Sequence, residues 1–260
     1  QTILGRSSSA RFWGGDGTSV HVQSERVQAA VIDRAGLDQW LAGRAVEAGA
    51  EVRQGWRADR IETLPDRVIV SDADGRSVQA RSLGLACGAS YRFHRQLDLG
   101  VPQAYMQSAQ CEAPFPIEPQ VQVRLGREVA PGGFAWLVSF ERAGEPYARI
   151  GLMCDVDGRQ HFEQFAARLC AEAGADPAML PAPRRKLLPL APVGKTYADR
   201  VVAVGDAAGL VKPTTGGGIY YGLISGAMAA EVLGPALASD RLGAPELKKY
   251  EKQWRRRLDG

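Results

Sequence analysis

The sequence predicts a mixed α/β fold of two parts, and three observations lead to this prediction. Residues 201–233 read as an apolar strand, a glycine-rich turn and a long helix, a combination typical of open α/β sheets. Short alternating stretches separated by turn signals predict further strands before it. A second set of strands follows a change to proline-rich composition near residue 101. With 260 residues and 45% hydrophobic content, the chain can bury a sizeable core.

An amphipathic helix and a series of short strands are expected in the first hundred residues. Apolar residues recur at three-and-four spacing over residues 34–48, and Gly49 ends that helix. Asp74 and Gly75 lie between two β-like runs and predict a hairpin. The expected strands cover residues 51–53, 57–62, 67–71, 77–80 and 82–87.

The second part is expected to be a sheet crossed by a helix. Val121, Val123 and Leu125 alternate with polar residues, as in a half-buried strand. Further strands are expected at residues 134–140 and 148–154, and a helix near residues 162–173. Prolines between residues 181 and 192 mark the return to the first part.

The segment 201–233 carries the strongest signal for chemistry. Its strand ends in Gly205 and Asp206, which places a carboxylate at the strand's carboxyl end, where open α/β sheets bind ligands. Gly216, Gly217 and Gly218 remove every Cβ ahead of the next helix, so a flat ring can lie against backbone amides. The amino terminus of that helix, with its free N–H groups and positive dipole end, suits an electron-rich ring edge.

This segment resembles the second FAD motif of the geranylgeranyl reductase family, flavoproteins with the p-hydroxybenzoate hydroxylase fold. The family pattern GDAAGxxxPxxGxGI is matched through Ala207, Ala208, Gly209, Pro213 and Ile219, as well as the residues already named. The resemblance implies that Asp206 binds the ribityl and pyrophosphate region of FAD. It also implies that the loop 213–219 lies along the flavin ring.

Other residues occur in the family's order. Arg34 resembles an arginine beside FAD and is expected to pair with phosphate; the alternative is a residue that only caps a strand. Ala58 matches the place where a backbone group reaches adenine. Cys87 stands where the family has Asp, which puts direct use of NAD(P)H in doubt. We expect Cys87 to be a small buried residue whose pKa is raised by apolar neighbours.

Two aromatic residues are candidates for the substrate cavity. Phe134 and Trp136, two positions apart in an expected strand, point to one face, and the resemblance implies that they contact an isoprenoid chain. The family's Phe-Pro-Lys is replaced by Val138, Ser139 and Phe140, which weakens the assignment of a geranylgeranyl chain. An ordinary pair of core aromatics explains them equally well.

The resemblance implies an FAD-binding Rossmann-like domain that lacks its first βαβ segment and carries an inserted antiparallel-sheet substrate domain. The expected division is residues 1–100 and 191–260 for FAD and residues 101–190 for substrate. No GxGxxG turn with an apolar strand before it is found in the chain, because the glycines of residues 14–17 follow no such strand. With no Met at position 1, we expect an amino-terminally truncated protein.

Several classes of function are excluded by composition. The net charge of +3, with mixed signs, gives no reason to expect nucleic acid. The four cysteines and three histidines have no metal-site spacing, so no metal is expected, and a reducing cytoplasm is the expected location. Residues 222–238 are too short and too rich in glycine for a membrane span. A basic amphipathic helix at residues 247–258 predicts either peripheral membrane contact or a solvated face on a packed helix.

The function expected from the resemblance is an FAD-dependent oxidoreductase that reduces C=C bonds of an isoprenoid or similar apolar substrate. Its reductant would be NAD(P)H or an electron-transfer protein, and no proton donor is identified. Flavin-dependent monooxygenation or halogenation is the alternative within the same fold. An inactive truncated remnant that binds an apolar ligand is the alternative outside enzymes.

Overall fold

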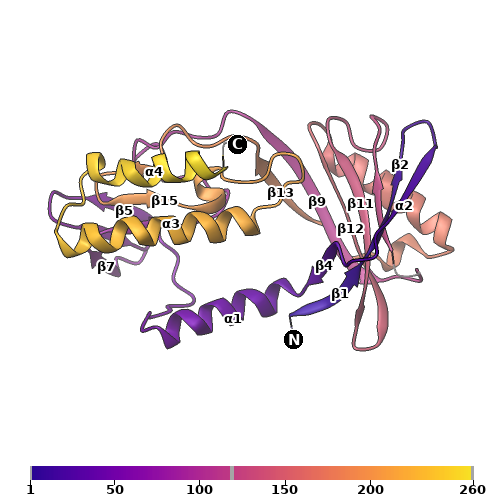
Figure 1. The fold of residues 1–260 in the computed structure, drawn as a ribbon, viewed down its shortest axis with the longest axis horizontal. Helices are drawn as coiled ribbons and strands as arrows, with labels where there is room; N and C mark the ends of the chain where they lie inside the picture. Colours follow the sequence, from indigo (N-terminus) through magenta and orange to yellow (C-terminus); the bar gives the residue numbers. More distant parts are fainter. Residues whose placement is uncertain (1, 118–119, 259–260) are drawn as a thin grey trace. The chain divides into compact units, whose positions relative to one another are not determined.

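The computed structural model describes residues 2–117 and 120–258 of the chain (Figure 1). It divides into two compact units. The first contains the chain up to Val52 together with Met106–Lys186, and the second contains Arg53–Tyr105 together with the chain from Leu187. Each unit has a hydrophobic core of its own.

A seven-stranded sheet forms the centre of the first unit, in the order β13-β9-β12-β11-β10-β2-β3. Its long central strands pair antiparallel, as the family resemblance implied, whereas β10 and β2 pair in parallel. The strands are β2 (Ser9–Trp13), β3 (Ser19–Gln23), β9 (Tyr105–Pro114), β10 (Val121–Arg124), β11 (Phe134–Arg142), β12 (Glu145–Cys154) and β13 (Arg184–Pro189).

The helix α2 (Gly158–Ala173) supplies the other half of this unit's core. Phe162, Phe165 and Leu169 of α2 are buried at helical spacing against alternate residues of the central strands. Arg124 of β10 makes an ion pair with Glu172, and the guanidinium group holds the pKa of that carboxyl below its usual range. The short helix η1 (Pro177–Met179) follows α2.

The first thirty residues of the chain form strands that the sequence analysis did not find. The chain turns from β2 to β3 at residues 14–18, where Gly17 has φ +84° and the Gly14 N–H donates to the Thr18 carbonyl over 2.9 Å. This glycine cluster is therefore a hairpin turn. β1 (Ile3–Ser7) pairs antiparallel with β4 (Ala29–Ile32), and β4 leads into α1 (Arg34–Glu47), the helix that was expected.

The second unit contains a small mixed sheet and an antiparallel meander. β15 (Val201–Ala203) pairs in parallel with β8 (Leu83–Leu85) and antiparallel with β14 (Tyr197–Ala198). The predicted hairpin at Gly75, with φ +83°, joins two strands of the meander. The meander consists of β5 (Arg60–Thr63), β6 (Val68–Ser71) and β7 (Ser77–Ala80). Residues 51–53, which were expected to form a strand, lie outside any strand.

Two helices pack on the small sheet. α3 (Ile219–Ala238) buries Ser225, Ala229 and Val232, and its length and apolar composition would also suffice to cross a membrane. α4 (Ala244–Leu258) buries Tyr250 and Trp254 completely. Their polar atoms are satisfied inside the unit, because the Tyr250 hydroxyl donates to the Ala203 carbonyl and the Trp254 indole donates to Thr196. The apolar face of the basic helix is thus occupied by the core of its own unit.

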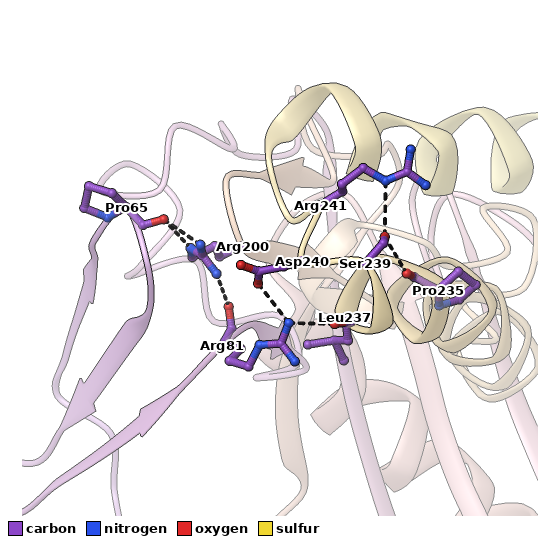
Figure 2. Close-up of polar contacts among 8 residues, drawn as sticks. All are labelled: Pro65, Arg81, Arg200, Pro235, Leu237, Ser239, Asp240 and Arg241. Atoms are coloured by element: carbon purple, nitrogen blue, oxygen red, sulfur yellow. Dashed lines mark hydrogen bonds and ion pairs between the residues drawn. The ribbon is translucent and has the colours of Figure 1, made fainter.

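Arginine side chains tie three connections of the second unit together (Figure 2). Arg200, with φ +63°, donates to the carbonyls of Pro65 and Arg81. The Arg81 guanidinium donates to the Leu237 carbonyl over 2.6 Å and pairs with Asp240 over 2.8 Å. This guanidinium therefore adds a second donor to a carbonyl in the last turn of α3, which also accepts from the Asp240 N–H over 3.4 Å.

The compact units do not follow the boundaries expected from the sequence. Residues 1–52 group with the large sheet, since β2 and β3 extend it and β1 contacts β11. Residues 53–105 group with the segment from Leu187 onward. The assignment of one part to FAD and another to substrate stays a prediction.

Candidate functional site

The turn η2 (Gly205–Ala208) joins β15 to the loop that leads into α3. Gly205 has φ +56° and lies against α3, because a Cβ added there would be 3.3 Å from the Cα of Gly222. Gly209 has φ +69°, and an added Cβ would be 2.4 Å from the Ala191 carbonyl oxygen. Both positions require glycine for two reasons, since positive φ and close backbone contact each disfavour a side chain.

Three side chains that the sequence analysis missed hold this turn. The Tyr91 hydroxyl donates to the Asp206 carbonyl over 2.8 Å, and His94 Nε2 lies 2.6 Å from the Ala207 carbonyl oxygen. The Gly205 N–H donates to the hydroxyl of Ser225 over 2.9 Å. The turn is therefore fixed by residues more than a hundred positions before it and by the helix that follows.

Burial sets the protonation state of these groups. It raises the pKa of Tyr91 and lowers the pKa of His94, which is fully buried. His94 is therefore neutral near pH 7, and the proton on Nε2 is the one that can be donated to a carbonyl oxygen. Its Nδ1 is buried and has no partner within the described part of the chain.

The Asp206 carboxylate lies at the amino terminus of α3. A Cβ added at Gly218, the N-cap of α3, would be 2.6 Å from Asp206 Oδ1, so the carboxylate lies directly against this N-cap residue. Gly218, as the N-cap residue, has no side chain of its own to cap the helix. The positive end of the helix dipole stabilises a negative charge in such a place.

The loop between η2 and α3 is exposed and held by its own backbone. Lys212 and Gly217 form a β-bridge, and the Gly216 N–H, at φ +66°, donates to the Lys212 carbonyl over 2.9 Å. Pro213 is exposed on this loop. The helix then begins with Ile219 and Tyr220, which are 37% and 58% exposed. Bare glycine backbone beside exposed apolar side chains is a surface on which a planar aromatic group can lie.

The other predicted cofactor contacts lie apart along the chain. Arg34 begins α1 in the first unit, where its guanidinium is exposed and pairs with Asp38 over 3.2 Å. Ala58 belongs to the second unit and is half-buried against that unit's core. Their roles at a cofactor stay predictions.

Phe134 and Trp136 lie side by side on β11, as their spacing predicts. Their ring centroids are 5.6 Å apart, and both side chains are half-buried. The Trp136 ring covers Gly151 of β12, where an added Cβ would be 2.4 Å from the ring. The structure thus shows an aromatic pair over a glycine, and its contact with a substrate stays a prediction.

Cys87 differs from the expectation. It was expected to be buried, but it is exposed in the segment just after β8. Its Sγ lies 3.1 Å from the Ser90 carbonyl oxygen. Partial desolvation still raises the pKa of the thiol, which is the expected direction. Within residues 2–117 and 120–258, no group of three His, Cys, Asp or Glu side chains is arranged to hold a metal ion.

Comparison with curated proteins gives archaeal relatives. The chain is 31% identical over 251 residues to digeranylgeranylglycerophospholipid reductase 1 of Methanopyrus kandleri, matching 88% of this chain and 64% of that protein. It is 30% identical over 283 residues to digeranylgeranylglycerophospholipid reductase 2 of Methanothermobacter thermautotrophicus, matching 97% of this chain and 67% of that protein. The chain thus spans about two thirds of the length of these relatives. A scan against protein-family models finds no match.

Solved structures show the same fold. A geranylgeranyl bacteriochlorophyll reductase-like protein from Thermoplasma acidophilum has a TM-score of 0.81 and 23% identity, covering 99% of this chain and 68% of that chain. The flavin-dependent halogenase CmlS has a TM-score of 0.70 and 16% identity, covering 98% and 51%. These likenesses confirm the fold class predicted from the sequence. Because the similarity to the curated reductases extends over nearly the whole chain, the chain belongs to the geranylgeranyl reductase family.

Proposed function

We propose that the protein is an FAD-dependent oxidoreductase that reduces C=C bonds of an isoprenoid or similar apolar substrate. One observation carries the proposal: the Asp206 carboxylate, a run of three half-buried or exposed glycines and the first turn of α3 lie together after the strand β15. Relatives named for reduction of an isoprenoid glycerophospholipid support it, as does the likeness to a halogenase PltM variant in complex with FAD.

The residues at the turn and loop fit a bound FAD. Gly205 and Asp206 would contact its ribityl and pyrophosphate region, and Pro213, Gly216, Gly217, Gly218 and Ile219 would lie along the flavin ring. Arg34 would pair with its phosphate, and the Ala58 backbone would reach its adenine. The surface offers what a flat ring needs, because these glycines carry no side chain and Ile219 adds an exposed apolar contact.

The chemistry would be divided between cofactor and protein. When bound, flavin supplies hydride transfer, and the protein supplies orientation, electrostatics and exclusion of water. His94 and Tyr91 would act through the backbone, since they fix the carbonyls of η2 and hence the position of the Asp206 side chain. Phe134 and Trp136 would offer an aromatic surface to an apolar chain.

The partners and location follow from the same proposal. An apolar substrate and a reductant, either NAD(P)H or an electron-transfer protein, are needed for a complete reaction. We propose a cytoplasmic protein that can sit at a membrane surface. Because Tyr250 and Trp254 are buried in the unit, contact with lipid would use the exposed basic residues of α4 rather than its apolar face.

Halogenation or monooxygenation is a second candidate within the same fold, favoured by the structural likeness to CmlS and to halogenase PltM. An inactive apolar-ligand-binding remnant is a third. The three candidates differ in their use of flavin. A reductase and a halogenase or monooxygenase both require bound flavin, whereas the remnant does not.

The first test is the visible absorbance spectrum of the purified chain, with and without added FAD. A second version carries the amino-terminal segment of one of the archaeal relatives. Flavin absorbance that survives gel filtration in at least one version supports the proposal. Asp206→Asn should weaken FAD binding at least tenfold, because a charge-assisted hydrogen bond to a ribityl hydroxyl is lost. Asp74→Asn, on the exposed hairpin, is the matched control and should leave FAD affinity unchanged.

Two outcomes would contradict the proposal. One is the absence of bound flavin in both versions when circular dichroism shows that both are folded. The other is equal FAD affinity of Asp206→Asn and the unmodified chain. If FAD binds, single-turnover oxidation of the reduced protein by a geranylgeranyl lipid without oxygen separates a reductase from an enzyme that uses oxygen.

A further inference from the structure

A pocket of about 430 Å³ opens within the first unit, where the start of α1 meets β9, β11, β12 and residues 181–184. The family motifs described above contribute one residue to it, Arg34. Six of its lining residues are charged: Asp33, Arg34, Glu112, Arg142, Arg149 and Arg184. All of them belong to the first unit, so the pocket does not depend on how the two units are arranged.

The charges in this pocket are unbalanced. Four arginines and two carboxylates give a net charge of +2. Glu112 serves two arginines at once, since it accepts from Arg142 over 2.9 Å and from Arg149 over 2.7 Å. One carboxylate between two guanidinium groups leaves one positive charge uncompensated.

The four arginines differ in the ion pairs and hydrogen bonds that already hold their guanidinium groups. Arg149 is the most buried, with 18% of its side chain exposed, and it also donates to the Ile32 carbonyl. Arg34 is held on α1 by Asp38. Arg184 is exposed, and among the described residues no carboxylate forms an ion pair with it. Arg184 is therefore free to bind an external anion, beside guanidinium groups that other contacts already orient.

We propose that this pocket binds a phosphate group, specifically the dianionic phosphomonoester of a substrate head group. Arginine presents planar, paired donors that match phosphate oxygens, and a phosphomonoester carries nearly two negative charges at pH 7. The lining attracts an anion, since its net charge is +2, or +1 when Asp38, the partner of Arg34, is counted with it. The volume exceeds what a phosphate ion fills, so a small polar body such as glycerol can follow the phosphate into the pocket.

The proposal deepens the proposed function by giving the substrate an anionic anchor, and it rests on that function only for the identity of the phosphate's carrier. Relatives that act on an isoprenoid glycerophospholipid are consistent with such an anchor. The family likeness assigns Arg34 to a phosphate of FAD instead. The two assignments require the same Arg34 side chain. The experiment therefore also measures whether FAD competes with phosphate for the pocket.

The experiment measures binding of inorganic phosphate and of glycerol 3-phosphate to the full chain by calorimetry, at constant ionic strength set with chloride. Both ligands should bind saturably without flavin. Arg184→Gln should weaken both by about tenfold, the loss of one charge-assisted contact, whereas Arg184→Lys should retain part of the affinity. Because Arg184 is exposed, its substitution should leave the fold intact, which circular dichroism checks.

Arg159→Gln is the matched control. Arg159 is also an exposed arginine of the first unit, it is paired with Glu163 on α2, and it does not line the pocket. An equal loss of phosphate binding in this variant would show a general charge effect and overturn the proposal. Absence of saturable binding by either ligand would also overturn it. Competition by FAD, with FAD affinity falling in Arg184→Gln, would assign the pocket to the cofactor and likewise overturn it.

Discussion

The turn Gly205–Gly209 and the arginine pocket at the start of α1 are held in different ways. Around the turn, contacts are buried or half-buried and specific: His94, Tyr91 and Ser225 each bond one backbone group of the turn. Around the pocket, contacts are ion pairs between side chains that keep part of their exposure to water, such as Arg142 with Glu112. Buried hydrogen bonds leave a costly unsatisfied group when broken, whereas exposed ion pairs contribute little. The turn should therefore be stiff and the pocket adaptable.

The largest effect is expected from Gly209→Ala. The substitution adds a Cβ that would be 2.4 Å from the Ala191 carbonyl oxygen, at a φ of +69°. Left-handed strain and overpacking together should lower the free energy of unfolding by about 3 kcal/mol or more. Urea denaturation followed by fluorescence measures it. Gly226→Ala in α3, where an added Cβ meets nothing within 4 Å, is the control and should stabilise by about 0.5–1 kcal/mol. Equal midpoints for the two variants would show that the turn is not constrained.

His94→Ala should have the next largest effect. It removes a fully buried ring and leaves the Ala207 carbonyl without its donor, at a cost of about 2–4 kcal/mol in the free energy of unfolding. His21→Ala, on the exposed strand β3, should change stability by less than about 0.5 kcal/mol. If His94→Ala were as harmless as His21→Ala, the contact with η2 would have no part in holding the turn.

The difference between the two regions also explains what the sequence could predict. The turn and loop were predicted because they are encoded by a contiguous motif, in which glycines and an aspartate occur at fixed spacing. Their supports were not, because His94 and Tyr91 reach the turn only through the tertiary fold, 113 and 115 positions away in the chain. The arginine pocket was missed for the same reason, since its arginines come from separate strands and connections with no common spacing.

Fold elements show the same pattern. Periodicity predicted α2 and the long central strands, whose apolar residues face a core. It also predicted α1, although this helix buries none of its residues. It missed β1 and β2 because their residues are at most half-buried, so hydrophobic alternation is weak there. It also expected Cys87 to be buried on the evidence of apolar neighbours in the sequence, whereas the chain turns at Gly88, with φ +68°, and leaves the thiol exposed.

A pH titration sharpens the comparison further. Burial lowers the pKa of His94 in the folded protein below its unfolded value of about 6.5, so the unfolded chain binds more protons at acidic pH. The contribution of His94 to stability is then complete above pH 6.5 and falls as the pH drops through that value toward the lowered folded pKa. Urea midpoints from pH 8 to pH 5 should show the fall in the unmodified chain. The slope should be shallower in His94→Phe, which keeps a ring in the cavity, and an unchanged slope would contradict the assignment.

The smallest effect is expected from Arg142→Gln. The ion pair with Glu112 is 2.9 Å long, but the Arg142 side chain is 44% exposed and Glu112 keeps Arg149 as a partner. Solvent screening therefore limits the change in unfolding free energy to less than about 1 kcal/mol. Arg127→Gln, at an exposed position of the same unit, is the control. A loss above about 2 kcal/mol relative to Arg127→Gln would mean that the pocket is as rigidly held as the turn. A small loss in Arg142→Gln would show that the fold does not depend on this ion pair. In the unmodified chain the Arg142 guanidinium can then exchange Glu112 for a phosphate without loss of stability, as a binding pocket requires.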